Sequence, residues 1–177
     1  MERFLDAPQA RLGLDFRRSH PKTVDASADP VDLRILRILQ EDGRITNQDL
    51  ASRAGLSPAA CFDRVKRLRQ SGVIAGYTAL LDPAKLGRAL LIFVEVVLDR
   101  TTDDVFTAFA AQVRDIPEVL ECHMVAGGFD YLLKVRVADM AAYRRFLGEI
   151  LTSIPGVRET RTYAVLEEVK ATTRLPI

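Results

Sequence analysis

The stretch HMVAGGFDYLL, residues 123–133, combines residue types that can recognise a small charged molecule. Gly127 and Gly128 expose bare backbone, whose N–H groups can bind a carboxylate. Asp130 can bind an ammonium group, and the apolar neighbours can receive a hydrophobic side chain. The stretch would therefore fit a free amino acid. It would equally fit a plain β-hairpin in which Gly-Gly supplies positive φ angles, and the residues alone leave both interpretations open.

A second chemical signal lies in an expected helix from Pro58 to about Ser71. Cys61, Val65 and Leu68 share one face at helical spacing, with Phe62 beside them, and should pack inward. The opposite face is small at its N-terminal end and basic further along. We expect it to carry Ala60, Asp63, Arg64, Arg67 and Gln70, flanked by Lys66. Small residues let a helix enter the DNA major groove, and Arg can read guanine or bind phosphate.

The elements that must position this helix begin at residues able to cap a helix, which are Asp29, Thr46 and Ser57. Pro30 and Pro58 follow two of these caps, at the first helical position where proline is favoured. Apolar residues recur at helical spacing behind each cap, and a glycine ends each segment. Two short helices joined by a glycine turn, after a leading helix, predict a helix-turn-helix.

The second half of the chain contains a short internal sequence repeat. The sequence Ile116-Pro117-Glu118-Val119 recurs as Ile154-Pro155-Gly156-Val157. Each copy follows an expected helix, at residues 103–115 and 139–153, and precedes a strand. Leading strands are expected at residues 90–99 and 131–137. Two such units predict a ferredoxin-like βαββαβ domain, and apolar side chains on both faces of its last strand indicate that another subunit covers the sheet.

Composition restricts the function further. The chain has 177 residues, 48% of them hydrophobic and 28% charged, as in ordinary soluble proteins. Neither a signal peptide nor an apolar run of roughly 18 residues is evident, so we expect a cytoplasmic protein with no membrane contact. Cys61 and Cys122 stand apart and should be reduced. No pattern of catalytic or metal-ligating residues appears, so we expect no enzyme, no metal and no cofactor.

The positive charge lies in the expected helix-turn-helix. Residues 30–80 contain 8 Lys and Arg against 5 Asp and Glu, whereas the whole chain has a net charge of +1. The predicted architecture is α+β. We expect a mobile arm at residues 1–28, a (winged) helix-turn-helix at 29–76, a strand linker at 77–87, the ferredoxin-like effector-binding and oligomerisation domain at 88–170, and a tail at 171–177.

Several motifs together resemble one known family. ILQEDGRITNQDLASRAGLSPAACFDRVKRL, SGVIAGYTALLDP, ECHMVAGGFDYLLKVRV and GVRETRTYAVLEEVK are similar to the Lrp/AsnC (leucine-responsive, feast/famine) transcription regulators. The resemblance covers about residues 29–175. FDRV and the tail ATTRLPI are similar to the branch that controls branched-chain keto acid or proline catabolism.

The resemblance implies a homo-oligomer, a dimer often assembled to an octamer, that binds double-stranded DNA and a small amino-acid effector. Leucine, another branched-chain amino acid or proline is the expected effector. The implied DNA-binding residues are Thr46, Asn47, Ser57, Ala59, Ala60, Asp63, Arg64, Lys66 and Arg67. The implied effector-binding residues are Met124, Ala126, Gly127, Gly128, Phe129 and Asp130, with Met140, Tyr163 and Ala164 near the response surface.

One position departs from the family pattern. Gly128 stands where the family often has an acidic residue, which removes a charge and loosens the loop. This departure puts effector identity and affinity in question. It keeps open a ligand-independent, architectural DNA-organising role. A sirohaem-decarboxylase-like enzyme on the same architecture is a weaker alternative. Such an enzyme needs histidines around a tetrapyrrole, and this chain contains only His20 and His123.

Overall fold

The computed structural model describes residues 29–177, and the predicted arm, residues 1–28, lies outside the described residues. Contacts divide the chain into two units. The first comprises the described residues up to Leu80 together with Thr172–Ile177, and the second is Leu81–Ala171. None of the described helices is long and apolar enough to cross a membrane.

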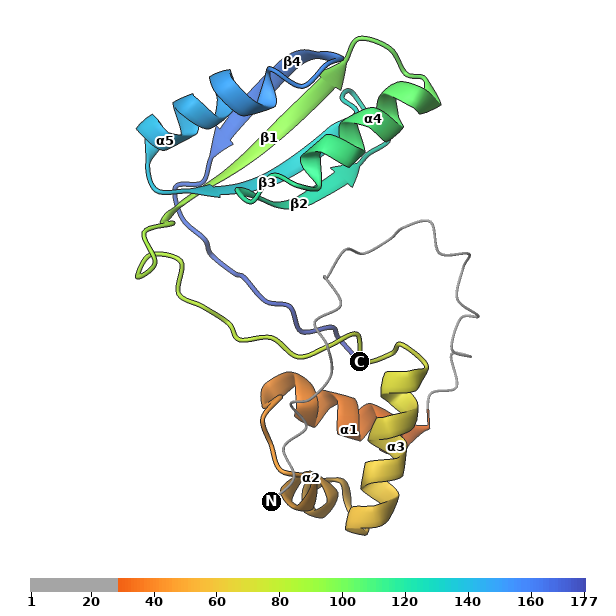
Figure 1. Cartoon of the computed structure of the whole chain (residues 1–177). Coiled ribbons are helices and arrows are strands. Elements are labelled where there is room, and N and C mark those ends of the chain that lie inside the picture. The colour runs from red at the N-terminus through yellow and green to blue at the C-terminus, as the bar shows by residue number, and fades with distance from the viewer. Residues whose placement is uncertain (1–28) are drawn as a thin grey trace. The chain divides into compact units, whose positions relative to one another are not determined.

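The first unit consists of the three predicted helices, α1 (Pro30–Glu41), α2 (Asn47–Ala54) and α3 (Pro58–Gln70) (Figure 1). Each predicted cap is confirmed. The side chains of Asp29, Thr46 and Ser57 accept hydrogen bonds from backbone N–H groups in the first turns of α1, α2 and α3. The helices enclose a small core of buried residues, consisting of Ile35, Ile38, Leu50, Ala51, Ala54, Cys61, Val65 and Leu68.

The C-terminal tail also belongs to the first unit. The Gln40 side chain donates to the carbonyl of Leu175 over 3.2 Å and accepts from its N–H over 2.6 Å. Arg37 Nε on the same helix donates to the carbonyl oxygen of Ile177 over 2.5 Å. Residues 71–89 form turns and irregular chain, so the linker that we predicted as a strand has no ladder partner in the described residues.

The second unit has the predicted βαββαβ order. Its elements are β1 (Leu90–Leu98), α4 (Asp103–Val113), β2 (Val119–Met124), β3 (Tyr131–Val137), α5 (Met140–Arg145), η1 (Phe146–Leu151) and β4 (Val157–Ala164). The strands form one sheet in the order β2-β3-β1-β4, and every neighbouring pair is antiparallel. This arrangement confirms the ferredoxin-like prediction.

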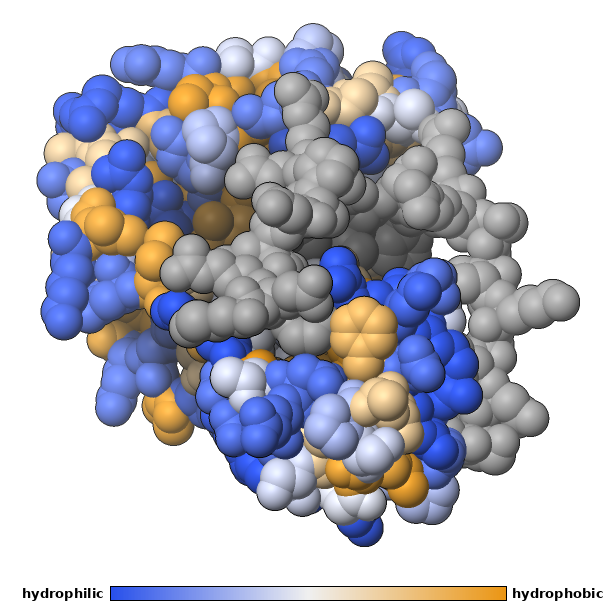
Figure 2. Space-filling model, turned by 60° about the horizontal axis from the view of Figure 1, so that its bottom comes forward, coloured by the Kyte–Doolittle hydropathy of each residue, from blue (hydrophilic) through white to orange (hydrophobic). Residues whose placement is uncertain are grey.

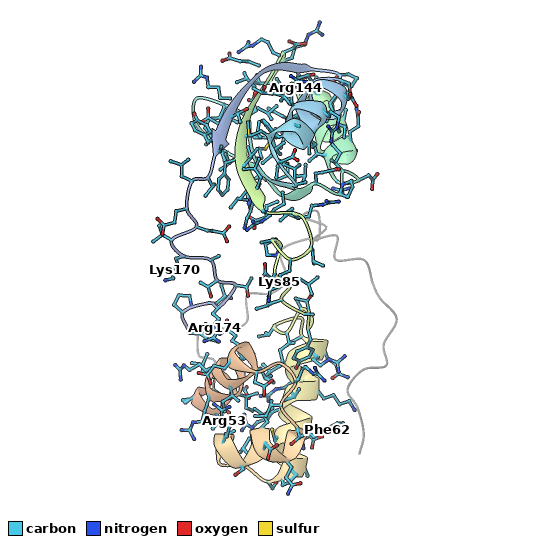
Figure 3. All side chains as sticks on the ribbon, turned by 90° about the vertical axis from the view of Figure 1, so that its left-hand side faces the viewer. Arg53, Phe62, Lys85, Arg144, Lys170 and Arg174 are labelled. Carbon is cyan, nitrogen blue, oxygen red and sulfur yellow. The ribbon has the colours of Figure 1, made fainter. Side chains whose placement is uncertain are left out.

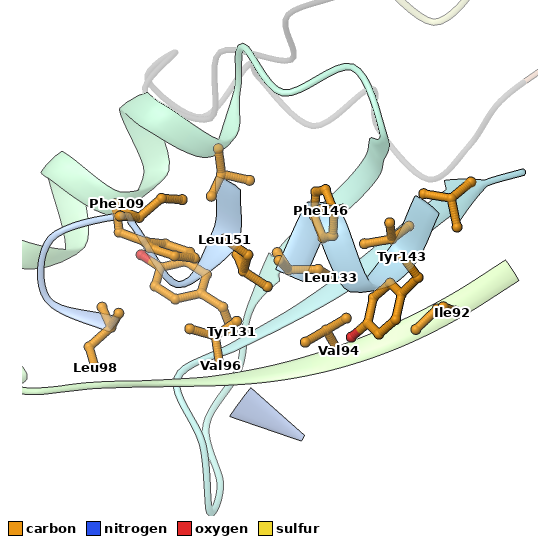
Figure 4. Close-up of a cluster of buried hydrophobic side chains, with 14 residues drawn as sticks. Ile92, Val94, Val96, Leu98, Phe109, Tyr131, Leu133, Tyr143, Phe146 and Leu151 are labelled. Carbon is orange, nitrogen blue, oxygen red and sulfur yellow. The ribbon is translucent and has the colours of Figure 1, made fainter. Parts of the chain in front are cut away.

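Both helical segments cover the same sheet face, and the main core lies beneath them (Figure 1). Alternate residues of β1 and β3, among them Val94 and Leu133, point into this core (Figure 4). Phe109 on α4 is fully buried and its ring centroid lies 4.6 Å from that of Tyr131. Elsewhere hydrophobic residues reach the surface among hydrophilic ones (Figure 2).

The second helical segment is not the single α-helix that we predicted for residues 139–153. It begins as α5 and continues as the π-helix η1. Phe146 and Leu151 are five positions apart and both are buried. Hydrogen bonds from i to i+5 widen the helix and allow residues at this spacing to face one core. The π-helical turn thus has two large buried residues five positions apart, Phe146 and Leu151, packed in the same core.

Candidate DNA-binding face and ligand pocket

The helix-turn-helix holds α3 by short-range contacts. Gly55 takes φ of 73° between α2 and α3, a conformation that glycine adopts without strain. Asn47 Nδ2 donates to the Pro58 carbonyl over 2.9 Å and so ties the start of α2 to the start of α3. Thr46, Asn47 and Ser57 are therefore engaged in shaping the two helix N-termini.

The outward face of α3 is small and then basic, as predicted. Ala59, Ala60, Asp63, Lys66 and Arg67 are all exposed. Phe62 differs from the expectation, because it is 44% exposed instead of packing beside the inner face. It lies at the surface of this unit, as does Arg53 on α2 (Figure 3). The helix thus presents an aromatic ring as well as cations.

Arg64 takes a different place from the one we predicted. Its Nη1 donates to Asp32 Oδ1 over 2.9 Å and to Asp29 Oδ2 over 2.5 Å, so its guanidinium lies against the start of α1. Arg67 Nη2 also donates to Asp32, over 2.5 Å. Arg64 precedes the buried Val65 on α3. Its long side chain extends from α3 to the N-terminal end of α1. The residue therefore joins α3 to α1.

The two carboxylates of Asp29 and Asp32 are paired with the guanidinium groups of Arg64 and Arg67. The Val31 N–H and the Arg64 guanidinium hold the pKa of Asp29 below its usual value. Hydrogen bonds to Asp32 and Asp29 raise the pKa of Arg64 further. Asp32 is the only buried charged or polar side chain among the described residues, at 7% exposure. Its carboxylate is acceptable there because two guanidinium groups bind it.

The predicted effector residues from Ala126 to Asp130 lie at the turn between β2 and β3. A cavity of about 240 Å³ opens there, lined by Val97, Leu98, Asp99, Arg100, Thr101, Gly127, Gly128, Phe129, Asp130 and Arg158. Four predicted residues, Gly127 to Asp130, are thus brought together. The others do not line this cavity in the single chain; they are Met124, Ala126, Met140, Tyr163 and Ala164. Tyr163 instead donates to Glu95 over 3.1 Å on the sheet face away from the helices.

The two glycines do not have the role that a plain hairpin predicts. Neither Gly127 nor Gly128 has positive φ, and a Cβ at either position would meet nothing within 4 Å. Backbone geometry and packing within this chain therefore do not require glycine here. Both positions leave open space facing the cavity.

Asp130 anchors this loop. Its Oδ2 accepts from Leu98 N over 2.7 Å, and its own N–H donates to Val96 O over 3.0 Å. One carboxylate oxygen is thereby committed to the end of β1. Our sequence interpretation assigned Asp130 to an ammonium group, and that function now competes with a structural one.

Sequence reasoning missed Asp99, Arg100, Thr101 and Arg158. Leu98 pairs with Val157 at a β-bulge, so the residues that follow β1 meet the start of β4 at this end of the sheet. The run of polar residues after β1 and the position of Arg158 one residue into β4 were the available signals. Strand order was needed to combine them.

Comparisons with known proteins agree with this architecture. Residues 91–175 match the model of the Lrp/AsnC ligand-binding domain, and residues 29–75 match a winged helix-turn-helix DNA-binding model. The leucine-responsive regulatory protein of Salmonella typhimurium is 56% identical over 149 residues, which cover 84% of this chain and 91% of that protein. The chain belongs to the Lrp/AsnC family.

Solved structures of this Lrp/AsnC type support the same assignment. A transcriptional regulator from Neisseria meningitidis, solved as an L-Met complex, superposes with a TM-score of 0.81 at 41% identity. That match covers 85% of this chain and 97% of the other. An AsnC family regulator from Agrobacterium tumefaciens gives a TM-score of 0.81 at 37% identity, covering 84% and 97%. This Lrp/AsnC chain is thus a DNA-binding transcriptional regulator with a ligand-binding domain, and not an enzyme.

Proposed function

We propose that a free amino acid binds the cavity at Gly127–Asp130 and thereby changes how the regulator binds DNA. The observation that carries this proposal is the pair of glycines that line the cavity without any steric or conformational need for glycine. Relatives named as leucine-responsive and the structure with L-Met favour an amino acid as the ligand. Leucine, another branched-chain amino acid, proline and methionine are the candidates.

The cavity offers both charges that an amino acid needs. Arg100 and Arg158 line the cavity, and a guanidinium group can bind a carboxylate through two parallel hydrogen bonds. Asp99 and the second oxygen of Asp130 can accept from an ammonium. Phe129 and Val97 supply apolar surface for a side chain.

The DNA-binding surface that we propose is the outward face of α3. Ala59 and Ala60 allow close approach to the major groove, while Lys66 and Arg67 supply charge for phosphates or bases. Thr46, Asn47 and Ser57 lie at the helix N-termini, whose N–H groups favour phosphate. Asp63 faces the same side and can accept from cytosine. Arg64 contributes by fixing the angle between α3 and α1.

We also propose that the protein works as a homo-oligomer in the cytoplasm, associated with the nucleoid. The sheet face opposite the helices carries apolar and charged residues side by side. Phe93 pairs with Tyr163 and with Lys134 across this face. Its half-buried aromatic ring favours a dimer formed sheet against sheet, which can assemble further to octamers.

A ligand-independent, DNA-organising role is the alternative, and Gly128 is the observation that favours it, because the loop there lacks a second carboxylate. A thermal-shift titration with the twenty amino acids separates the two functions. A ligand at one hundred times its dissociation constant stabilises the folded state by about 2.7 kcal/mol. We expect a thermal shift with at least one apolar amino acid. The same amino acid should also change which DNA sequences the protein selects from a library of random duplexes, or how tightly it binds them. DNA binding without any response to amino acids would support the architectural role.

A matched pair of variants assigns the response to this cavity. Gly128→Leu places a side chain in the cavity, whereas Gly76→Leu makes the same change at another glycine with free space and without positive φ. We expect Gly128→Leu to abolish the thermal shift and Gly76→Leu to retain it. An undiminished shift in Gly128→Leu would place the ligand elsewhere.

A further inference from the structure

A second cavity lies in the ligand-binding unit, away from the Gly127–Asp130 loop. Its volume is about 340 Å³, and it is lined by Arg88, Glu118, Val137, Ala138, Ala142, Arg145, Phe146, Glu149 and Ile150. Val137 pairs with Leu90 at one end of the β1–β3 ladder, and Tyr131 pairs with Val96 at the other. Six residue steps of roughly 3.3 Å therefore put the two cavities about 20 Å apart.

Glu118 gives this cavity an unmet chemical requirement. Its Oε2 is buried and has no hydrogen-bond partner in the described part of the chain. Buried carboxylate oxygens in folded proteins almost always have a donor, because an unpaired one retains its full desolvation cost. A donor that enters the cavity would remove this cost.

The cations on the same wall do not meet that requirement. The Arg145 side chain forms no ion pair or hydrogen bond with any described residue, and the Arg88 side chain donates only to the adjacent Gly87 carbonyl. Both arginines line the cavity with Glu118, yet neither forms an ion pair with its carboxylate. The wall of the cavity therefore carries two arginines and the Glu118 carboxylate, which are not paired with one another.

The remaining wall is apolar and irregular. Val137 and Phe146 are buried, and Ala142 and Ile150 are half-buried. Phe146, Glu149 and Ile150 all belong to η1, and π-helical turns occur frequently at functional sites. A single buried carboxylate is a poor metal site, and no group of three or more His, Cys, Asp or Glu residues gathers among the residues described.

We infer that this cavity is a second binding site for a free α-amino acid. The ligand ammonium donates to Glu118 Oε2, the ligand carboxylate binds Arg88 or Arg145, and an aliphatic side chain packs on Phe146 and Ile150. The site is independent of the Gly127–Asp130 cavity. A zwitterion fits because it carries one positive and one negative group, which are complementary to the unpaired Glu118 carboxylate and the two arginines of the wall.

Equilibrium dialysis with radiolabelled L-leucine, L-methionine and L-proline tests this inference on the full chain. We would compare the wild type with Gly128→Leu, Glu118→Gln and Ala138→Phe, using Glu167→Gln as the matched control. Glu167 is exposed and lines neither cavity. Ala138→Phe fills the second cavity from an exposed position and leaves Glu118 unchanged. Thermal unfolding confirms that each variant is folded.

For at least one probe, we expect two classes of site in the wild type. Gly128→Leu should remove one class, while Glu118→Gln and Ala138→Phe should each remove or weaken the other at least tenfold. Binding that Gly128→Leu abolishes and Glu118→Gln leaves intact would overturn the second site but keep the proposed function. Binding that is lost only in Glu118→Gln and Ala138→Phe would support the second site and overturn the proposed site at Gly127–Asp130. Absence of binding for all three probes would overturn both.

Discussion

Arg64 Nη1 on α3 lies 2.9 Å from Asp32 Oδ1 on α1, across the packing interface of the helix-turn-helix. Asp32 is nearly buried, and Arg64 also binds the residue that caps α1. The first helix and the DNA-facing helix are thereby fixed to each other by charge as well as by the apolar core. This relationship separates two kinds of cation on α3, those that hold the fold and those available to DNA.

The Arg64→Ala variant should lose stability. Removing the guanidinium leaves the buried Asp32 carboxylate with Arg67 alone, and hydrogen bonds to charged groups contribute about 1.5–3 kcal/mol. We expect a loss of about 1–3 kcal/mol, measured by urea unfolding followed by circular dichroism. DNA affinity at a temperature where the variant is fully folded should fall through misorientation of α3. Unchanged stability would show that the pair contributes nothing to the fold.

The Lys66→Ala variant provides the contrast. Lys66 is exposed and forms no ion pair among the described residues, so its removal should leave stability within about 0.5 kcal/mol. If Lys66 binds a phosphate, DNA affinity should fall similarly for all sequences, and the slope of log affinity against log salt should decrease by about one. Fluorescence anisotropy at several salt concentrations measures both. An unchanged salt slope would exclude Lys66 from the phosphate contacts.

Acid should weaken the cap of α1. The pKa of Asp29 is lowered in the folded state, first by the Val31 N–H and then by Arg64. A carboxylate with a depressed folded pKa contributes stability above its unfolded pKa of about 4, and this contribution is lost as pH falls through the folded value. Asp29→Asn retains a good cap but cannot titrate.

Urea unfolding of the wild type and Asp29→Asn at a series of pH values checks this prediction. The wild type should be the more stable protein at neutral pH. The difference should shrink below about pH 4 as Asp29 becomes protonated. A difference that stays constant down to pH 2 would contradict the assigned cause.

Introducing an acidic residue at position 128 should change the ligand response without changing the fold. A Cβ at Gly128 would meet no atom within 4 Å and φ is not positive there, so Gly128→Asp should alter stability by no more than about 0.5 kcal/mol. A new carboxylate beside Asp130 should strengthen ammonium binding and lower the dissociation constant several-fold. Calorimetric titration with the amino acid that gives the largest thermal shift measures the change. Gly76→Asp is the control, and an equal change in both variants would refute the assignment.

The sequence was most informative where structure depends on neighbours in the chain. Asp29, Thr46 and Ser57 cap helices through residues two or three positions away, so local pattern was sufficient to predict them. The internal sequence repeat predicted the second unit because each copy lies within one βαβ unit. Helical spacing likewise identified Cys61 and Val65 as core.

The sequence was less informative where residues far apart in the chain meet. Arg64 binds Asp32, and Arg158 shares a cavity with Asp99, only because the folded chain brings them together. Periodicity assigns a residue to one face, but a long Arg side chain can cross between faces. The sequence left hairpin and pocket both open for the glycine pair for a related reason, since Gly-Gly is typical of hairpin turns and the actual φ angles depend on the loop.

The exposed sheet face provides the last prediction, which concerns assembly. Phe93 on β1 lies in one row with Lys134 on β3 and Tyr163 on β4, on the face that the helices leave uncovered. If a second copy covers this face, Phe93→Asp buries a new charge in the interface beside Lys134, which already pairs with Glu121, and a loss of several kcal/mol is expected. Light scattering should then show a shift toward the monomer mass, with helical circular dichroism retained. Gln112→Glu adds the same charge on the exposed side of α4 and should leave the mass unchanged. An unchanged assembly in Phe93→Asp would mean that the copies associate through another surface, because a buried additional carboxylate should strongly weaken close contact between two such faces.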